Sequence, residues 1–156
     1  MHPGYHWVAN ASPGTPEASS FFTIVDSTLN ETGDGSGEGP IGFSSLYMLN
    51  MRNVEINGWT NETMQGQVEN VVIDNIEIAD NASLNIWPAN GVSNSIMIRN
   101  SRIGYNTTQP TRINGRAGSS TKVVNSQLNT PVNLNMQSQP ELLNCYDSDL
   151  TPIPNQ

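Results

Sequence analysis

The sequence predicts an all-β solenoid, a fold in which one short structural unit stacks on the next. A motif anchored on an Asp or an Asn returns six times, at Asp26, Asn53, Asn75, Asn100, Asn125 and Asp147. The anchors are 27, 22, 25, 25 and 22 residues apart. A near-constant period of roughly 20–30 residues is typical of solenoids. Apolar and polar residues alternate within each copy, so we expect two short strands that meet at the anchor.

The alternation defines three apolar columns that we expect to stack inside the fold. Two residues before the anchors stand Ile24, Met51, Ile73, Ile98, Val123 and Cys145. Four before them stand Phe22, Leu49, Val71, Ile96, Thr121 and Leu143, and three after them stand Leu29, Ile56, Ile78, Ile103, Leu128 and Leu150. The lone cysteine, Cys145, has no internal disulfide partner, so it is expected to serve as a small buried hydrophobe.

The anchors suit a bend between two strands for a chemical reason. Asn and Asp tolerate the left-handed backbone region and form hydrogen bonds with their own neighbours. If the copies stack, their side chains come to lie one above another. We therefore expect vertical hydrogen bonds along a column of anchors.

These features resemble the right-handed parallel β-helix of the pectate-lyase-like superfamily, in which an asparagine ladder marks the turn between the second and third sheets. The resemblance covers about residues 21–151 and rests on the runs FTIVDSTL, YMLNMRNVEI, NVVIDNIEI, SIMIRNSRI, TKVVNSQL and ELLNCYDSDL. It implies a right-handed single-stranded parallel β-helix of about six coils with an Asn/Asp ladder. It implies no particular chemistry, because lyases, hydrolases, epimerases, phage tailspikes and adhesins share this fold.

The two ends of the chain are expected to differ from this repeat. Residues 1–20 contain three prolines and are predicted to be an irregular lead-in or end-plug. Residues 152–156 contain two prolines and are predicted to be a tail that stops strand pairing.

No amphipathic helix precedes the first copy, so an open strand edge is expected there. Either a longer chain covers this edge, or copies of the chain associate, for example as a homotrimer. The predicted contacts are the outward apolar residues Val25, Val72, Met97 and Val124.

The composition limits the partners. The formal net charge is −8 and six residues are Lys or Arg, so the chain lacks the basic surface that nucleic acids or anionic membranes require. No apolar run approaches the roughly 18 residues of a membrane span. The first residues also lack the pattern of a signal peptide. We expect an extracellular or virion-surface protein, made either as a particle component or as part of a longer secreted chain.

A second set of alternating residues predicts the remaining sheet of each coil. Its inward residues would be Leu84, Ile86, Ile113, Val132, Leu134 and Met136. The outward residues would then be Asn85, Trp87, Arg112, Asn114, Asn133 and Asn135, with Tyr105 and Arg116 in adjoining loops. Aromatic rings stack on sugars, amides bind hydroxyls and arginines pair with acidic groups. This face therefore predicts a polysaccharide or cell-surface glycan as partner. The alternative is that Trp87 folds back over the coil as a structural residue.

The resemblance also implies a catalytic alternative, a polysaccharide lyase acting on an acidic glycan. Its lyases use an arginine or lysine base beside carboxylates that hold calcium, so Arg112 or Arg116 would be the base. No Asp/Glu cluster accompanies these arginines on the same strip. The sequence argues mildly against catalysis in this segment, and whether the chain is an enzyme stays open.

The acidic residues give only weak metal candidates. No cofactor is expected, except that calcium could bind Asp34 and Glu38 in a glycine-rich loop, or the stacked Glu55 and Glu77. Arg102 would relieve that stacked pair without a metal. Next to the anchors, the charges of Arg52, Asp74 and Arg99 alternate, which predicts a surface row of ion pairs.

Overall fold

The computed structural model is all-β in the part of the chain that it describes. Those residues are 7–9, 21–30, 41–58, 64–81, 83–87, 95–114, 120–134 and 141–155, and none of them lies in a helix. Consequently, no helix among them is long and apolar enough to cross a membrane.

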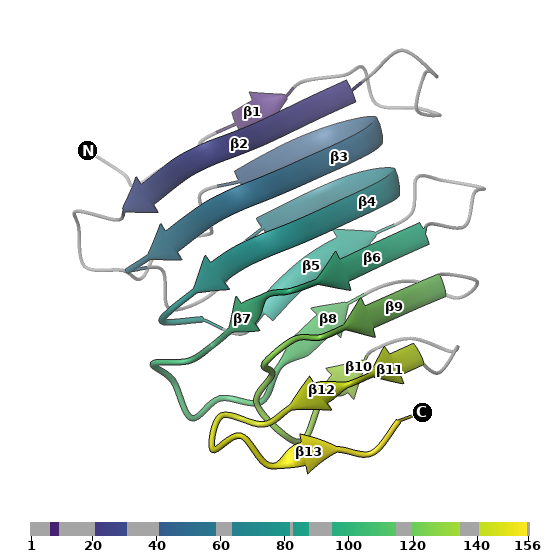
Figure 1. The fold of residues 1–156 in the computed structure, drawn as a ribbon. Coiled ribbons are helices and arrows are strands. Elements are labelled where there is room, and N and C mark those ends of the chain that lie inside the picture. The colour runs from purple at the N-terminus through teal and green to yellow at the C-terminus, as the bar shows by residue number, and fades with distance from the viewer. Residues whose placement is uncertain are drawn as a thin grey trace.

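The described residues form strands that follow one another down the molecule (Figure 1). They are β1 (Trp7–Ala9), β2 (Phe21–Asn30), β3 (Ile41–Asn57), β4 (Met64–Ile78), β5 (Ser83–Trp87), β6 (Ser95–Arg99), β7 (Arg102–Ile103), β8 (Arg112–Asn114), β9 (Ser120–Val124), β10 (Asn133–Leu134), β11 (Glu141–Leu143), β12 (Cys145–Tyr146) and β13 (Pro152–Ile153).

An 11-stranded sheet contains all of these strands except β12 and β13, and its pairings are parallel. The sheet divides into three strips. The first strip holds β1, the beginnings of β3 and β4, then β5, β8 and β10. The second strip holds the start of β2, the middles of β3 and β4, then β6, β9 and β11. The third strip holds the ends of β2, β3 and β4, then β7.

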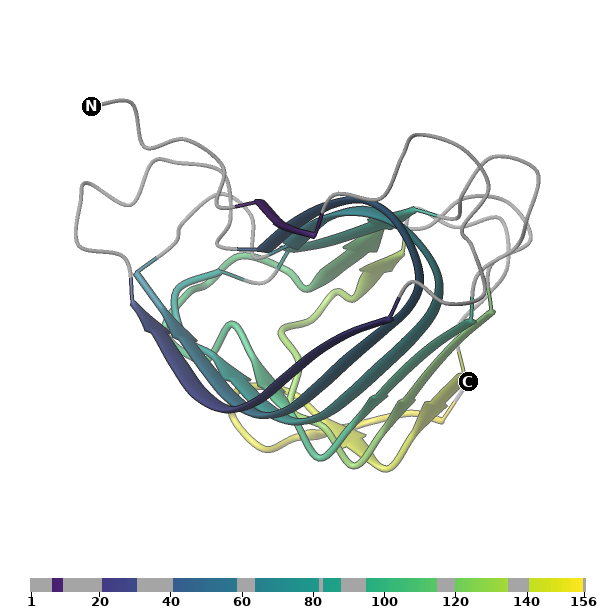
Figure 2. The same cartoon turned by 90° about the horizontal axis from the view of Figure 1, so that it is seen from above.

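Strands β3 and β4 bend sharply between the first and second strips (Figures 1 and 2). The first strip therefore lies across from the second, and the apolar side chains fill the space between them. Leu84 of the first strip and Ile73 and Ile98 of the second are all fully buried. The core is thus built from residues far apart in the sequence.

The first five copies of the motif are in the predicted register. Ile24 pairs with Met51, Met51 with Ile73, and Ile73 with Ile98, which pairs with Val123. Four of these five side chains are 0% exposed, whereas Ile24 of β2 is partly buried. Ile24 differs because β2 has a strand partner on one side only among the described residues.

The column of anchors is present, and its residues adopt the left-handed conformation. Their φ angles are 49° at Asp26, 54° at Asn53 and Asn75, 53° at Asn100 and 50° at Asn125. Asn53 Nδ2 donates to Asp26 Oδ1 over 2.7 Å, and Asn75 Nδ2 donates to Asn53 Oδ1 over 3.0 Å. The next link is displaced, because Asn100 Nδ2 donates to Asp74 Oδ1 over 2.9 Å.

The predicted sixth anchor, Asp147, is wrong. Asn144 takes that place, with φ 52° and a 2.8 Å bond from its Nδ2 to Asn125 Oδ1. Leu142, rather than Cys145, follows Val123 in the buried column. The last step is therefore 19 residues. The segment ELLNCYD has apolar residues at 142, 143 and 145, so its alternation fits two registers and the neighbouring strand selects one.

The change of anchor from Asp147 to Asn144 also alters the register and burial of the other residues in the last copy. Leu143 pairs with Val124 and is partly exposed, and Leu150 is 70% exposed, although both were expected inside. Two residues after the anchors, where we expected polar outward residues ending in Gln127 and Asp149, Tyr146 follows Gln127 instead. Cys145 is buried as predicted, but it directly follows the anchor, as Ser126 does in the copy before. Burial raises the pKa of its thiol, which therefore stays protonated at neutral pH.

The predicted tail forms a strand, so the expectation that it stops strand pairing was wrong. β13 pairs antiparallel with β12, joining Cys145 to Ile153 and Tyr146 to Pro152. Ile153 is 9% exposed and belongs to the core cluster. Proline is tolerated in such an edge strand because its missing N–H is not needed there. The tail therefore covers part of the last row of the core.

Candidate functional site

The first strip brings several of the predicted sugar-binding positions into register. Asn85 of β5 pairs with Asn114 of β8, and Arg112 pairs with Ser83 on one side and Asn133 on the other. Leu84 and Ile113, which pair with each other, are both 0% exposed. Arg112, next to Ile113, is exposed. The predicted inward and outward alternation is therefore confirmed at positions 112 and 113.

Other predicted site residues fall beyond what the structure describes. Asp34, Glu38, Arg116 and Asn135 lie outside the described residues. For Asn85, Trp87, Asn114 and Asn133 the backbone is described and the side chain is not.

Tyr105 lies, as predicted, in a segment that leads to the first strip, between β7 and β8. It follows β7, and the Arg102 guanidinium carbon lies 4.3 Å from the centre of its ring. Its described contact is thus with the third strip. Desolvation, and secondarily the charges of Glu77 and Glu55, raise the pKa of its hydroxyl, which is therefore neutral at physiological pH.

The stacked glutamates are confirmed as neighbours. Glu55 pairs with Glu77, and Glu77 pairs with Arg102 in the next strand. An Arg102 Nη1 lies 3.6 Å from a Glu77 carboxylate oxygen, and Arg102 Nε donates to Gln127 Oε1 over 3.1 Å. Arg102 therefore supplies the positive charge that this column needs. In the described part of the chain, no group of three His, Cys, Asp or Glu side chains is placed to hold a metal ion.

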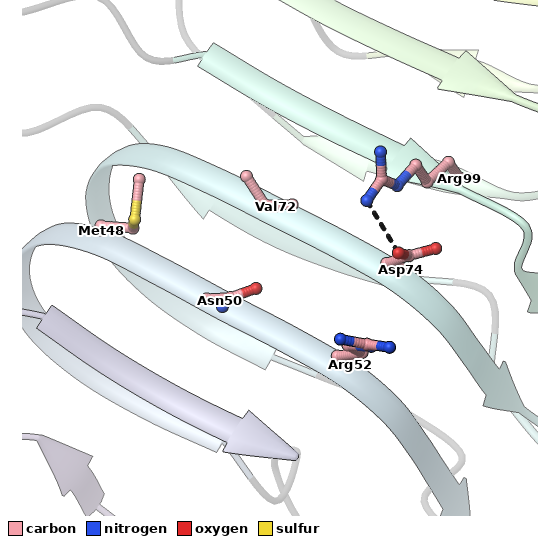
Figure 3. Close-up of a pocket in the computed structure, with 6 residues that line it drawn as sticks. All are labelled: Met48, Asn50, Arg52, Val72, Asp74 and Arg99. Carbon is pink, nitrogen blue, oxygen red and sulfur yellow. Dashed lines mark hydrogen bonds and ion pairs between the residues drawn. The ribbon is translucent and has the colours of Figure 1, made fainter. Parts of the chain in front are cut away.

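A pocket of about 460 Å³ lies on the outer face of the second strip, where no site was predicted. Strands β3, β4 and β6 provide its lining residues, which are Met48, Asn50, Arg52, Val72, Asp74 and Arg99 (Figure 3). They point outward because they alternate with the buried column of Met51, Ile73 and Ile98. This pocket combines two guanidinium groups, one carboxylate, one amide and two apolar side chains.

The predicted alternating charges form the polar side of this pocket. Arg99 Nη2 lies 2.8 Å from Asp74 Oδ2, with side chains 51% and 19% exposed. Hydrogen bonds from Asn100 and Arg99 hold the pKa of Asp74 below its usual range, so it is ionised at neutral pH. Arg52 pairs with Asp74 in the backbone register, yet it makes no hydrogen bond or ion pair with the residues that the structure describes.

The sequence contained the charges of this pocket but gave no reason to combine them with its apolar residues. Met48 shares the outward face of β3 with Arg52, whereas Val72 comes from the next copy of the motif and reaches this surface only through the pairing of β3 with β4. The possible signal was an outward apolar residue two positions before an outward charge, as in Val72 and Asp74.

Comparison of the chain with protein-family models, with curated proteins and with solved structures gave no match. The chemistry of the two surfaces follows from their own residues. Exposed guanidinium groups pair with carboxylates, sulfates or phosphates, and amides bind hydroxyl groups. The exposed guanidinium groups of Arg112 on the first strip and Arg52 on the second are therefore the described groups that can pair with an anion.

Proposed function

We propose that this chain is a right-handed, single-stranded parallel β-helix of about six coils and forms the shaft of a glycan-binding protein outside the cell or on a virion. Three strips with parallel register support this architecture, since β3 and β4 each pass through all three in order. The left-handed Asn and Asp residues recur at the same register position and support it further.

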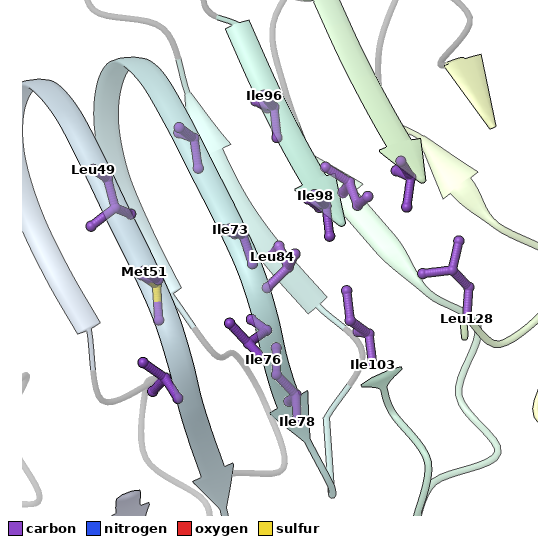
Figure 4. Packing of buried hydrophobic residues seen from close by; sticks show 14 of the residues in the cluster. Leu49, Met51, Ile73, Ile76, Ile78, Leu84, Ile96, Ile98, Ile103 and Leu128 are labelled. Carbon is purple, nitrogen blue, oxygen red and sulfur yellow. The ribbon is translucent and has the colours of Figure 1, made fainter. Parts of the chain in front are cut away.

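The core is consistent with a rigid shaft. Buried side chains from successive strands stack along the molecule, and residues of the first strip, such as Leu84, meet those of the second and third (Figure 4). In a solenoid, each row buries the apolar surface of the next, so rigidity comes from short-range stacking. Such a rod holds surface groups at fixed spacings, which suits recognition of a polymer with regular repeats.

The glycan proposal rests on the exposed position of Arg112 in the first strip. It is exposed above a buried Ile113, and its neighbours across the strip include Asn133 in direct register. Asn85 and Asn114 pair two positions farther along the strip. A guanidinium among amide-bearing positions provides donors for both the acidic and the hydroxyl groups of a glycan.

A glycan array with the purified chain tests this proposal. Arg112→Ala and Trp87→Ala should each reduce binding to acidic glycans, while Arg102→Ala, an arginine of the third strip, is the matched control. If the intact chain binds no glycan, the proposal is wrong and the chain is a structural shaft. If the chain binds but the Arg112 and Trp87 variants bind as well as the control variant, recognition by the first strip is wrong.

The same samples separate binding from catalysis. A lyase would produce an unsaturated sugar, which absorbs in the ultraviolet. An absorbance rise with a uronate polymer and calcium, lost in Arg112→Ala, would assign the lyase reaction instead. We expect binding without this rise, because none of the ion pairs among the described residues joins an Asp or Glu to Arg112.

A further inference from the structure

The pocket on the outer face of the second strip has more positive than negative side chains. It holds two arginines and one aspartate on a chain with net charge −8. Its volume of about 460 Å³ is large enough for a small ligand, since ligand pockets commonly span roughly 300–1,000 Å³. A local excess of positive charge on an acidic chain favours an anionic group there.

The two arginines have different roles. Arg99 is held by the 2.8 Å contact with Asp74, whose other oxygen accepts a hydrogen bond from Asn100. Arg52 has Val25 and Asp74 as its register neighbours and has no ion pair or hydrogen bond with the described residues. The charge of Arg52 also lowers the pKa of Asp74, but Arg52 makes no hydrogen bond to it among the described residues, so its exposed guanidinium keeps its donors for a ligand.

The rest of the pocket adds selectivity to this charge. Met48 and Val72 are partly exposed and provide an apolar surface, and Asn50 lies between Met48 and Arg52 on β3 (Figure 3). Asp74 still has acceptor capacity on its two oxygens. A sugar ring complements these groups, because it has an apolar C–H face and hydroxyls at its rim.

We infer that this pocket binds an anionic sugar unit, with Arg52 pairing with its carboxylate or sulfate. Asn50 donates hydrogen bonds to its hydroxyls and accepts them, the Asp74 carboxylate accepts them, and Met48 and Val72 contact the ring. The choice of a glycan as ligand rests on the proposed function. The pocket residues do not take part in the proposed first-strip site, because the pocket lies on the second strip and Arg112 on the first.

Titration calorimetry with three oligosaccharides of equal length tests the inference: a uronate oligomer, a sulfated oligomer and a neutral oligomer. The intact chain should bind an acidic oligomer more tightly than the neutral one, and added salt should weaken the binding. The stronger of the two acidic ligands identifies the anionic group as carboxylate or sulfate.

Two variants probe the pocket itself. Arg52→Ala should weaken acidic binding by roughly tenfold to a hundredfold, the range for losing a charged hydrogen-bond partner. Val72→Phe should weaken it as well by filling the pocket while keeping every charge. Arg102→Ala changes the net charge equally and should leave the affinity within about twofold. Far-ultraviolet circular dichroism confirms that each variant is folded.

The pattern of losses separates the two proposals. If Arg112→Ala abolishes binding and the Arg52 and Val72 variants bind like Arg102→Ala, the pocket inference is wrong and the first-strip proposal stands. If only the pocket variants lose affinity, the inference stands and the first strip is not the binding face. If the intact chain binds no acidic oligomer at millimolar concentration, both are wrong.

Discussion

The backbone conformation of the anchors gives the sharpest test of the fold. Asn53 has a φ of 54°, where side chains other than those of Asn and Asp are strained and glycine is not. It also forms two exposed hydrogen bonds, to Asp26 and from Asn75. We compare Asn53→Ala with Asn53→Gly, because both variants lose the same two bonds and differ mainly in backbone strain.

The magnitudes follow from these contacts. Loss of two exposed hydrogen bonds costs about 1–2 kcal/mol in either variant. Alanine adds about 1–2 kcal/mol of left-handed strain, whereas glycine adds about 0.5–1 kcal/mol through the greater freedom of the unfolded chain. Asn53→Ala should therefore be less stable than Asn53→Gly by about 0.5–1 kcal/mol.

Thr28 provides the matched control on the same outer surface. It is exposed, pairs with Glu55 and is not among the residues with positive φ. There the order should reverse, with Thr28→Gly less stable than Thr28→Ala by about 0.5–1 kcal/mol. Guanidinium unfolding followed by circular dichroism measures all four variants. If glycine is the worse substitution at both positions, the left-handed anchor is wrong.

Four further predictions concern the core, the charges, a buried amide and assembly. Ile98→Asp should unfold the domain, because Ile98 is 0% exposed and an unpaired buried charge costs several kcal/mol. Met97→Asp, on the partly exposed outer side, should leave the domain folded. Circular dichroism distinguishes these outcomes, and equal effects of the two substitutions would contradict the assigned faces. Asp74 has a lowered pKa, so the stability that it contributes is present at neutral pH and is lost as the pH falls below about 4. In guanidinium unfolding, the Asp74→Asn variant should therefore lose less stability between pH 7 and pH 3 than the unmodified protein does. An equal loss in both proteins would refute this. Asn129 Nδ2 donates hydrogen bonds to the backbone carbonyls of residues 104, 107 and 109. Asn129→Ala should therefore lower the free energy of unfolding by about 1–3 kcal/mol. Asn129→Asp should lower it further, since a carboxylate would face those oxygens, and thermal unfolding tests this order. The isolated chain should self-associate in sedimentation experiments, and a monomer at tens of micromolar would contradict the predicted open edge.

The sequence by itself determined the repeating part of the fold. Local alternation specifies which side chains share a face of a strand, so the column from Met51 to Val123 was predictable from spacing alone. The left-handed anchors from Asp26 to Asn125 were predictable as well, because few residue types tolerate that conformation. Leu84 and Ile113 were also assigned to one buried column by the same alternation.

Tertiary structure decided what local alternation leaves ambiguous. The last copy fits two registers, and pairing of Leu142 with Val123 selects Asn144 as its anchor. Ile153 joins the core because β13 folds back on β12, which depends on a partner strand rather than on its own sequence. The pocket around Arg52 has the same origin. Its residues come from strands about one repeat apart, and the pairing of those strands brings Val72, Asp74 and Arg99 beside the outward face of β3.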